Sequence, residues 1–162
     1  MIKKLFGIKT METIISPMTG KVVHLEDVPD KVFSQKLVGD GIAIEPAEGR
    51  VVSPLEGEVV QLFPTKHAIG IRGKNGLEVL IHIGLDTVEL NGEGFQGHVE
   101  QGDKVQIGDL LLTVDMELIK KKSYNLISPV VITNSDMVDS ITKSEENFVY
   151  SGKSVLLTVK KK

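Results

Sequence analysis

Residues Leu77–Leu90 read LEVLIHIGLDTVEL, and the first half of this stretch has the pattern of a buried β-strand. From Leu77 to Ile83 both odd and even positions are β-branched or leucine, with the exceptions of Glu78 and His82. Apolar residues at both parities indicate a strand that is covered on both faces. A titratable imidazole therefore occupies, at His82, a position where valine is typical.

A second short strand is predicted just upstream. Residues His67–Arg72 read HAIGIR, and Gly73–Gly76 between the two strands reads GKNG, which is typical of a tight turn. The two strands are therefore expected to form a β-hairpin.

The hairpin brings two histidines together. If Lys74-Asn75 are the central turn residues, His67 stands directly opposite His82, and if Asn75-Gly76 are central, His82 faces Ile69 with His67 one diagonal step away. Side chains alternate along a strand, so in either register both imidazoles lie on the same face. Opposite Cβ atoms are roughly 5 Å apart and diagonal ones about 7–8 Å, so the spacing predicts that the two rings can meet.

Composition indicates one ordinary globular domain rich in turns. The 162 residues are 41% hydrophobic and 25% charged, which leaves enough apolar side chains for a proper core. Sixteen glycines against seven aromatic residues suit a β-protein with many tight turns.

Charge and residue usage exclude several classes. A net charge of −3 with no basic cluster argues against a nucleic-acid partner. Only Arg50 and Arg72 are arginine, so no arginine clamp for a phosphate or carboxylate ligand is expected. The absence of cysteine excludes disulfides and cysteine-based zinc sites and fits a reducing cytoplasm. No apolar run approaches the roughly 18 residues of a membrane span.

The N-terminal residues Met1–Lys9 have no signal-peptide pattern. We expect residues 1–12 to be a flexible segment rather than a weak amphipathic anchor for a membrane surface.

Two pairs of segments repeat. Ile14–Val23 and Val51–Val60 share two apolar residues, Ser-Pro, two variable residues, Gly, one variable residue and Val-Val. A second echo joins Gly39–Ile44 to Gly108–Thr113. The repeats favour a duplicated β-unit whose halves wrap into a barrel or sandwich around a shared core.

Three short helical segments are expected between the strands. One helical turn is predicted near Lys31–Ser34, and Asp115–Lys122 has the acidic start and basic end that suit the helix dipole. Asn134–Thr142 is the third, with Asn134 or Ser135 as its N-cap.

The paired histidines differ from the other two. His24 follows Val-Val in a polar context and is expected at the surface, and His98 follows a glycine-rich stretch and is expected in a loop. Two facing imidazoles, His67 and His82, carry four ring nitrogens that need partners, and an apolar site supplies few. The pair therefore favours a functional site over two histidines that are merely buried core residues.

Three kinds of chemistry fit such a pair. A zinc ion uses three or four protein ligands, and beside His67 and His82 only Asp86 is an evident nearby carboxylate. Hydrolysis with one histidine as general base lacks a serine or cysteine in a recognisable nucleophile elbow. In the third case, one imidazole accepts a phosphoryl group and the other steadies it.

The third case is physically sound. A neutral imidazole is a competent nucleophile at pH 7, because its pKa is near 6.5. A second imidazole can donate an N–H to the phosphoryl oxygens without adding a full charge. Thr65, two residues before His67, could fix the His67 tautomer through its hydroxyl, and Asp30 and Asp86 would give the rim a negative charge for a basic partner.

At these residues the chain resembles a known family. Leu80–Leu90 followed by Asn91–Phe95 is similar to the active-site signature of the glucose-type IIA proteins, phosphocarriers of the bacterial phosphoenolpyruvate-dependent sugar phosphotransferase system. The match continues in order at Ser16–Gly20, Glu26–Phe33, Val38–Ile44, Thr65–Ala68, Gly102–Gly108 and Ser128–Asn134. The resemblance implies an all-β fold, an antiparallel β-sandwich or duplicated barrel-sandwich hybrid, with residues 13–162 as a single domain.

The resemblance also implies roles for the site residues. His82 would accept the phosphoryl group on Nε2 from phospho-HPr and pass it to a cysteine of a IIB domain during sugar uptake. His67 matches the histidine that binds the phosphoryl group and supports onward transfer, Thr65 matches the residue that orients it, and Asp86 lies at the rim. The protein would be a cytoplasmic phosphotransferase component without a metal or organic cofactor.

An apolar docking face is implied around this centre. Its expected members are Asp30, Val32, Phe33, Leu37, Val38, Phe63, Leu80, Ile81 and Val88. The alternatives are a regulatory module of the same fold that transfers nothing, and a partner-binding module in which His67 and His82 hold zinc in a complex with a regulatory target. A purely structural β-domain would not require two histidines on one face.

Overall fold

The computed structural model describes residues 11–162, and their regular structure is almost entirely antiparallel β-sheet with a few short helices. The all-β prediction is confirmed. Most of the flexible segment predicted for residues 1–12 falls on residues 1–10, which lie outside the described residues. Met11 and Glu12 are not flexible as predicted, because they begin a strand and pair with Lys160 and Val159.

The largest sheet has eight strands. Across the sheet these are β13 (Phe148–Val149), β2 (Gly20–Val23), β3 (Asp40–Pro46), β11 (Ser128–Ile132), β7 (Glu78–His82), β6 (Ala68–Gly73), β5 (Gly57–Leu62) and β9 (Lys104–Val105). Strand β7 lies near the middle, between β11 and β6. Val79 and Ile81 are fully buried on one face and Leu80 and His82 are half-buried on the other, so β7 is covered on both faces as predicted.

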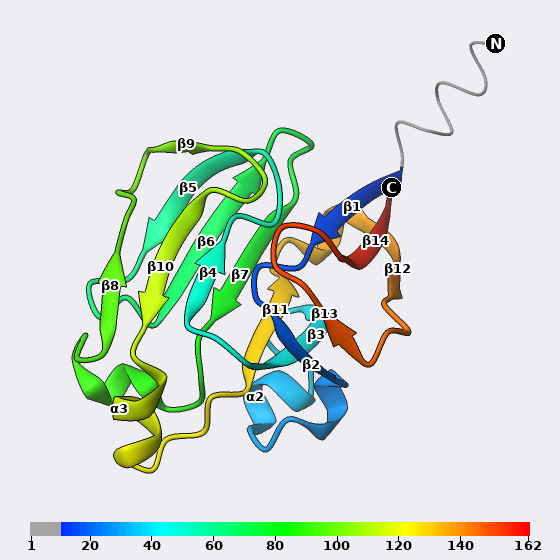
Figure 1. Ribbon diagram of the computed structural model, residues 1–162. Coiled ribbons are helices and arrows are strands. Elements are labelled where there is room, and N and C mark those ends of the chain that lie inside the picture. The colour runs from blue at the N-terminus through cyan, green and yellow to red at the C-terminus, as the bar shows by residue number, and fades with distance from the viewer. Residues whose placement is uncertain (1–10) are drawn as a thin grey trace, which may run out of the picture.

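Two three-stranded sheets complete the sandwich. One contains β4 (Arg50–Val52), β10 (Leu110–Val114) and β8 (Phe95–Gly97), and the other contains β1 (Met11–Ile15), β14 (Val155–Lys161) and β12 (Val138–Lys143). In Figure 1, β4 and β10 lie in front of β5, β6 and β7. All three sheets contribute to one hydrophobic core, for example through Leu112, Ile71 and Ile14, each of which is fully buried. Burial of apolar surface between the layers is the main stabilising contribution.

The short helices begin at capping aspartates. Helix α2 (Lys31–Ser34) follows Asp30, whose carboxylate accepts a hydrogen bond from the Val32 N–H at 2.9 Å. Helix α3 (Met116–Lys121) follows Asp115, which accepts one from the Leu118 N–H at 3.1 Å. Both helices lie where they were predicted. The 3₁₀ turns are η1 (Leu25–Asp27), η2 (Thr87–Leu90) and η3 (Ser135–Met137).

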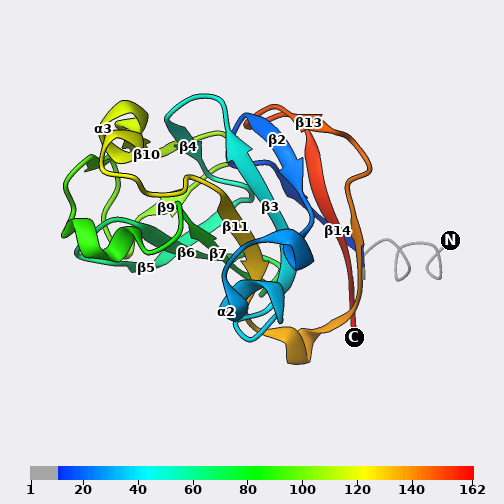
Figure 2. The ribbon, with the colours of Figure 1, turned by 90° about the horizontal axis from the view of Figure 1, so that it is seen from below.

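Helix α2 and η1 cover the second face of the large sheet. In Figure 2, α2 lies beside β3 and β11. Phe33 of α2 and Leu25 of η1 pack with Ala43 and Val131 in a second, smaller hydrophobic cluster. This cluster lies on the Leu80–His82 side of β7, which places α2 beside His82.

The helix predicted over Asn134–Thr142 is wrong. The segment contains only η3 before it continues as β12, which pairs with β14. The Asn134 side chain makes no cap hydrogen bond, because it accepts from the Glu78 N–H at 2.9 Å and donates to the Gly76 carbonyl at 2.8 Å. Partly buried Val138 and Ile141 pack on the core as strand residues.

The first sequence repeat has a structural counterpart. The Ile15 N–H donates to the Pro54 carbonyl and the Val52 N–H donates to the Pro17 carbonyl, both at 2.9 Å, so equivalent residues of the two copies exchange equivalent bonds. The second pair of similar segments has no such structural counterpart. Gly39–Ile44 leads into β3 of the large sheet, whereas Gly108–Thr113 leads into β10 of a small one.

Candidate functional site

The two predicted histidines meet at the open end of the β6–β7 hairpin. Their ring centroids are 5.0 Å apart and the rings are nearly perpendicular, at 83°. The predicted contact is therefore confirmed.

The predicted register of the hairpin is wrong, however. Ala68, not His67 or Ile69, lies opposite His82, because the turn is a three-residue loop, Lys74–Gly76, with Gly76 at φ +87°. Regular alternation from this register would place His67 on the other face.

His67 reaches His82 because it precedes the strand. Lys66 adopts a left-handed conformation at φ +55°, and β6 begins only at Ala68. The backbone is still anchored to the hairpin, since the Ile83 N–H donates to the His67 carbonyl at 2.7 Å. The turn thus frees the His67 side chain from strand alternation and directs it toward His82.

Two phenylalanines flank the imidazoles. Phe33 of α2 lies 4.9 Å from the His82 ring centroid, and Phe63 lies 5.2 Å from that of His67. His67 is only 5% exposed, whereas His82 is half-buried. The pair therefore sits in an apolar setting that is open to solvent mainly on the His82 side.

A backbone carbonyl fixes the tautomer of His82. Its Nδ1 lies 2.7 Å from the Gly84 carbonyl oxygen. A carbonyl oxygen only accepts hydrogen bonds, so Nδ1 carries the proton and the neutral ring has its lone pair on Nε2. Gly84 adopts φ +77°, and a Cβ there would lie 2.9 Å from the Asn125 carbonyl oxygen and 2.7 Å from the Thr87 methyl group. Only glycine presents this carbonyl without strain.

Thr65 is the partner of His67, as predicted. Its hydroxyl lies 2.5 Å from His67 Nδ1. A hydroxyl can donate this bond, in which case the neutral His67 ring carries its proton on Nε2.

Both imidazoles are neutral at pH 7. Burial, with a smaller contribution from His82, lowers the pKa of His67 to about 4. Burial also lowers the pKa of His82, although the hydrogen bond to Gly84 and the charges of Asp30 and Asp86 act in the opposite direction. Desolvation disfavours the charged ring, and nearby carboxylates favour it. The site thus offers an uncharged nucleophile.

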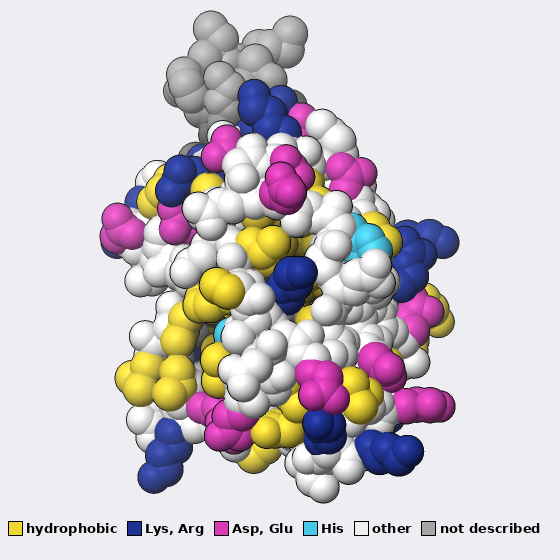
Figure 3. All heavy atoms as spheres, turned by 90° about the vertical axis from the view of Figure 1, so that its left-hand side faces the viewer, with side chains coloured by type: hydrophobic (Ala, Val, Ile, Leu, Met, Phe, Trp, Pro, Cys, Tyr) yellow, Lys and Arg dark blue, Asp and Glu magenta, His cyan; other side chains and the backbone are white. Residues whose placement is uncertain are grey.

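The predicted docking face is only partly exposed. Val32, Leu37 and Val88 are 44%, 69% and 49% exposed. Asp30, Val38, Phe63 and Leu80 are half-buried, and Phe33 is buried against His82. Figure 3 shows a histidine in a hollow beside a group of hydrophobic side chains.

Ile81 does not belong to this face. It is fully buried in the main core, because its side chain points to the opposite side of β7 from His82. The expectation that Ile81 lines the docking face is wrong.

The other two histidines lie where the sequence predicted. His24 is exposed, and His98 is exposed in a loop, where its Nε2 lies 3.0 Å from the Thr113 hydroxyl.

Across residues 11–162, no three His, Cys, Asp or Glu side chains are grouped to hold a metal ion. Within the same range, no helix has the length and apolar character needed to cross a membrane.

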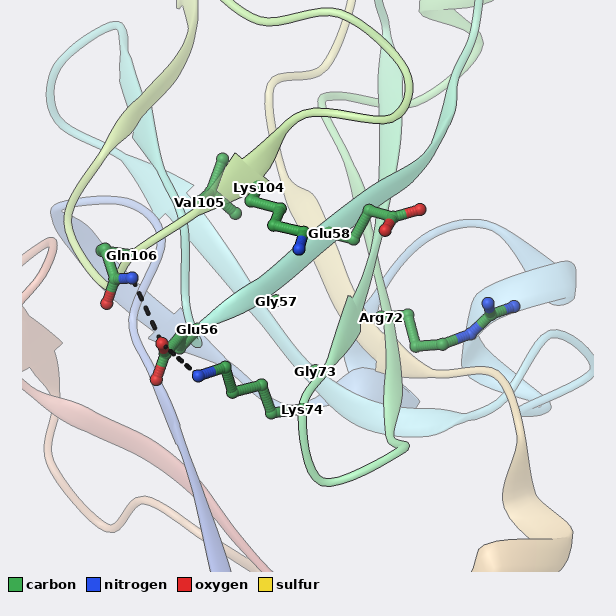
Figure 4. A pocket seen from close by; sticks show the side chains of 9 residues that line it. All are labelled: Glu56, Gly57, Glu58, Arg72, Gly73, Lys74, Lys104, Val105 and Gln106. Carbon is green, nitrogen blue, oxygen red and sulfur yellow. Dashed lines mark hydrogen bonds and ion pairs between the residues drawn. The ribbon is translucent and has the colours of Figure 1, made fainter.

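A pocket of about 420 Å³ lies at the opposite, turn end of the hairpin. Figure 4 shows its lining residues from β5, β6 and the segment around β9. Glu56 there accepts hydrogen bonds from Lys74 at 2.8 Å and Gln106 at 3.2 Å. Its charged groups largely neutralise one another, and it holds no histidine.

Sequence reasoning missed the backbone partner of His82. Gly84 follows the buried strand directly, and a glycine at that point was a usable signal of a special backbone conformation. The Gly84 N–H in turn donates to the Ser128 hydroxyl oxygen at 3.2 Å, and the sequence pattern gives no signal for this contact.

Comparison with known proteins identifies a family. The sequence profile described as phosphoenolpyruvate-dependent sugar phosphotransferase system, EIIA 1, matches residues 12–138. A glucose-specific EIIA component of this system from Bacillus cereus is 56% identical over 144 residues, covering 87% of each chain. The protein of the same description from Halalkalibacterium halodurans is 47% identical and covers 99% of this chain and 98% of its own.

A solved structure shares the fold. Glucose permease IIA from Mycoplasma capricolum superposes with a TM-score of 0.84 at 38% sequence identity, covering 91% of this chain and 95% of that one.

Proposed function

The chain belongs to the EIIA 1 family of the phosphoenolpyruvate-dependent sugar phosphotransferase system, and we propose that His82 is the residue that carries its phosphoryl group. As a member of this family, the protein is a phosphotransferase component that accepts the group from HPr and passes it to a IIB domain. The comparisons support this phosphocarrier over a module that transfers nothing. Residues 13–162 act as one EIIA unit in this proposal.

One observation carries the assignment of His82. The bond from Nδ1 to the Gly84 carbonyl leaves the Nε2 lone pair as the free nucleophilic position of a ring that is neutral at pH 7. The other imidazole is nearly enclosed and its Nδ1 is engaged by Thr65. Of the two rings, His82 is the one that a donor protein can reach.

In the first transfer, Nε2 of His82 attacks phosphorus. The new N–P bond forms as the bond to the HPr donor atom breaks, and that atom keeps the electron pair. The Nδ1–H bond to the Gly84 carbonyl stabilises the positive charge that develops on the ring. In the second transfer, a cysteine sulfur of the IIB domain attacks phosphorus and Nε2 recovers its lone pair.

His67 acts on the phosphoryl oxygens. With the Thr65 hydroxyl donating to Nδ1, the Nε2–H of His67 is available as a donor beside His82. Because the pKa of His67 is about 4, it donates as a neutral group. A neutral donor stabilises the transferred group without trapping it, which suits a carrier that must also release the group.

The exposed side chains around His82 form the docking surface. Val32, Leu37 and Val88 supply apolar contact, and Asp30 and Asp86 supply negative charge for a basic partner.

We extend to this chain the glucose specificity named for its relatives, a cytoplasmic location, and transfer without a resident metal or organic cofactor.

The test is the intact mass after incubation with phosphoenolpyruvate, enzyme I and HPr. Wild type is expected to gain one acid-labile phosphoryl group, and His82→Ala is expected to gain none. His98→Ala is the control, since His98 is exposed in a loop and its ring pairs with the Thr113 hydroxyl. Normal labelling of His82→Ala would overturn the assignment.

A further inference from the structure

Three serines that precede proline are completely buried. Ser16, Ser53 and Ser128 are each 0% exposed. In the repeated segments, the Ser16 hydroxyl donates to the Met18 carbonyl at 2.7 Å and that of Ser53 donates to the Leu55 carbonyl at 2.8 Å. These two serines each stabilise their own turn.

Ser128 is bonded differently. Its hydroxyl donates backwards to the Leu126 carbonyl at 2.8 Å, and its oxygen accepts a hydrogen bond from the Gly84 N–H at 3.2 Å. The second bond joins the first residue of β11 to the loop that follows β7. Of these three serines, Ser128 alone connects to the histidine site.

Gly84 transmits this contact to His82. Its N–H is held by Ser128, and its carbonyl accepts from His82 Nδ1 at 2.7 Å. The next N–H, that of Leu85, donates to the Asn125 carbonyl at 2.9 Å. The segment from Asn125 to Ser128 thus holds both amide groups that flank the carbonyl.

The loop after β7 is held by one further hydrogen bond and leaves no space for a side chain at Gly84. The Thr87 hydroxyl donates to the Ile83 carbonyl at 2.6 Å, and Gly84 is buried with no room for a Cβ. If Ser128 lost its hydroxyl, the buried Gly84 N–H would lack a partner, which is costly enough to shift the backbone. A shifted carbonyl would no longer hold the proton on Nδ1 of His82.

We propose that Ser128 is a positioning residue that keeps the His82 ring in the Nδ1–H tautomer through the Gly84 backbone. Its importance for phosphoryl transfer rests on the proposed function, whereas its effect on the His82 tautomer does not. Ser128 touches neither the imidazole nor the transferred group in this proposal.

The experiment compares Ser128→Ala with Ser53→Ala. Each variant removes one hydroxyl from a fully buried serine before proline, but only the first removes the partner of Gly84. The readouts are the ¹⁵N chemical shifts of the two ring nitrogens of His82 and the rate of phosphoryl transfer from phospho-HPr.

Ser128→Ala is expected to move both ring shifts toward the Nε2–H tautomer and to slow transfer roughly tenfold. Ser53→Ala is expected to leave both unchanged. If Ser128→Ala does not fold, the nearly isosteric Ser128→Cys, which has only a weak acceptor, is expected to move the shifts in the same direction.

The proposal would be overturned if the His82 ring ¹⁵N chemical shifts in the folded Ser128 variant equalled those of wild type. Absence of transfer in wild type would instead refute the proposed function, and the ring shifts would still decide the role of Ser128.

Discussion

The β6–β7 hairpin has two polar ends that are built in opposite ways. At the turn end, Arg72 pairs across the strands with Glu78 at 2.8 Å, and Lys74 pairs with Glu56 at 2.8 Å around the pocket of Figure 4. At the open end, two neutral imidazoles lie among phenylalanine side chains.

The difference shows which end performs chemistry. Exposed ions at the turn end satisfy one another in water, where each pair contributes little and tolerates replacement. The imidazoles at the open end are kept uncharged by burial, and directional hydrogen bonds fix which nitrogen is free. The pocket at the turn end is therefore a poorer guide to function than the two rings with defined tautomers at the open end.

The largest effect is expected from substituting a glycine at each end of the hairpin. Gly84 and Gly76 both have positive φ, at +77° and +87°, so alanine at either costs about 1–2 kcal/mol of backbone strain. At Gly84 the new Cβ also meets the Asn125 carbonyl, whereas at Gly76 it meets the flexible Met137 side chain.

Gly84→Ala is expected to slow phosphoryl transfer on the order of a hundredfold, because it displaces the carbonyl that orients His82. Gly76→Ala is expected to lower the melting temperature without changing transfer. Transfer rates with phospho-HPr and thermal melts of both variants provide the check, and equal effects on transfer would contradict the account.

His67→Gln is expected to separate the two transfer steps. The nucleophile remains, so phospho-HPr still labels His82, but the donor beside the phosphoryl oxygens is altered and onward transfer to the IIB domain falls at least about tenfold. Single-turnover rates for each step test this. Labelling that slows at least about tenfold while onward transfer keeps its wild-type rate would contradict the role given to His67.

Acidification is expected to lower the free energy of unfolding of the protein through His67 at the open end. The unfolded histidine binds its proton near pH 6.5, whereas folded His67 binds it only near pH 4. The stabilisation is therefore complete above pH 6.5 and is lost as pH falls toward 4, by up to about 1.4 kcal/mol per pH unit. Denaturant unfolding of wild type between pH 7.5 and 4.5 should show this slope, and His67→Gln should show a smaller one.

The turn end is expected to give the smallest effect. A double-mutant cycle on Arg72 and Glu78 should yield a coupling of about 0.2–1 kcal/mol that decreases with salt, because both side chains are substantially exposed. Transfer rates should not change. A coupling of several kcal/mol would show that this ion pair is not the weak contact expected of exposed charges.

The sequence predicted the parts of the site that depend on residue type. The two histidines, Thr65 and helix α2 follow from side-chain chemistry and local pattern, and all were found together. The aspartate before α2 and the one before α3 are local capping signals, which is why these short helices were predictable.

Features that depend on backbone geometry were not predicted correctly. The three-residue turn with Gly76 in the left-handed position shifted the register, and only the turn at Lys66 restored the predicted contact between the rings. Asn134 resembled a helix cap but instead bonds to the hairpin turn from the loop after β11, a strand that pairs with β7. Ile81 could have been placed correctly, because alternation from an outward His82 directs it to the core.

The most direct test is to determine which ring nitrogen carries the phosphoryl group. Protein labelled with ¹⁵N-histidine would be phosphorylated through HPr and the ³¹P–¹⁵N one-bond coupling recorded on the ring nitrogens. The expected result is coupling to Nε2 of His82, with Nδ1 still protonated and bonded to the Gly84 carbonyl. Coupling to Nδ1 of His82, or to either nitrogen of His67, would contradict it.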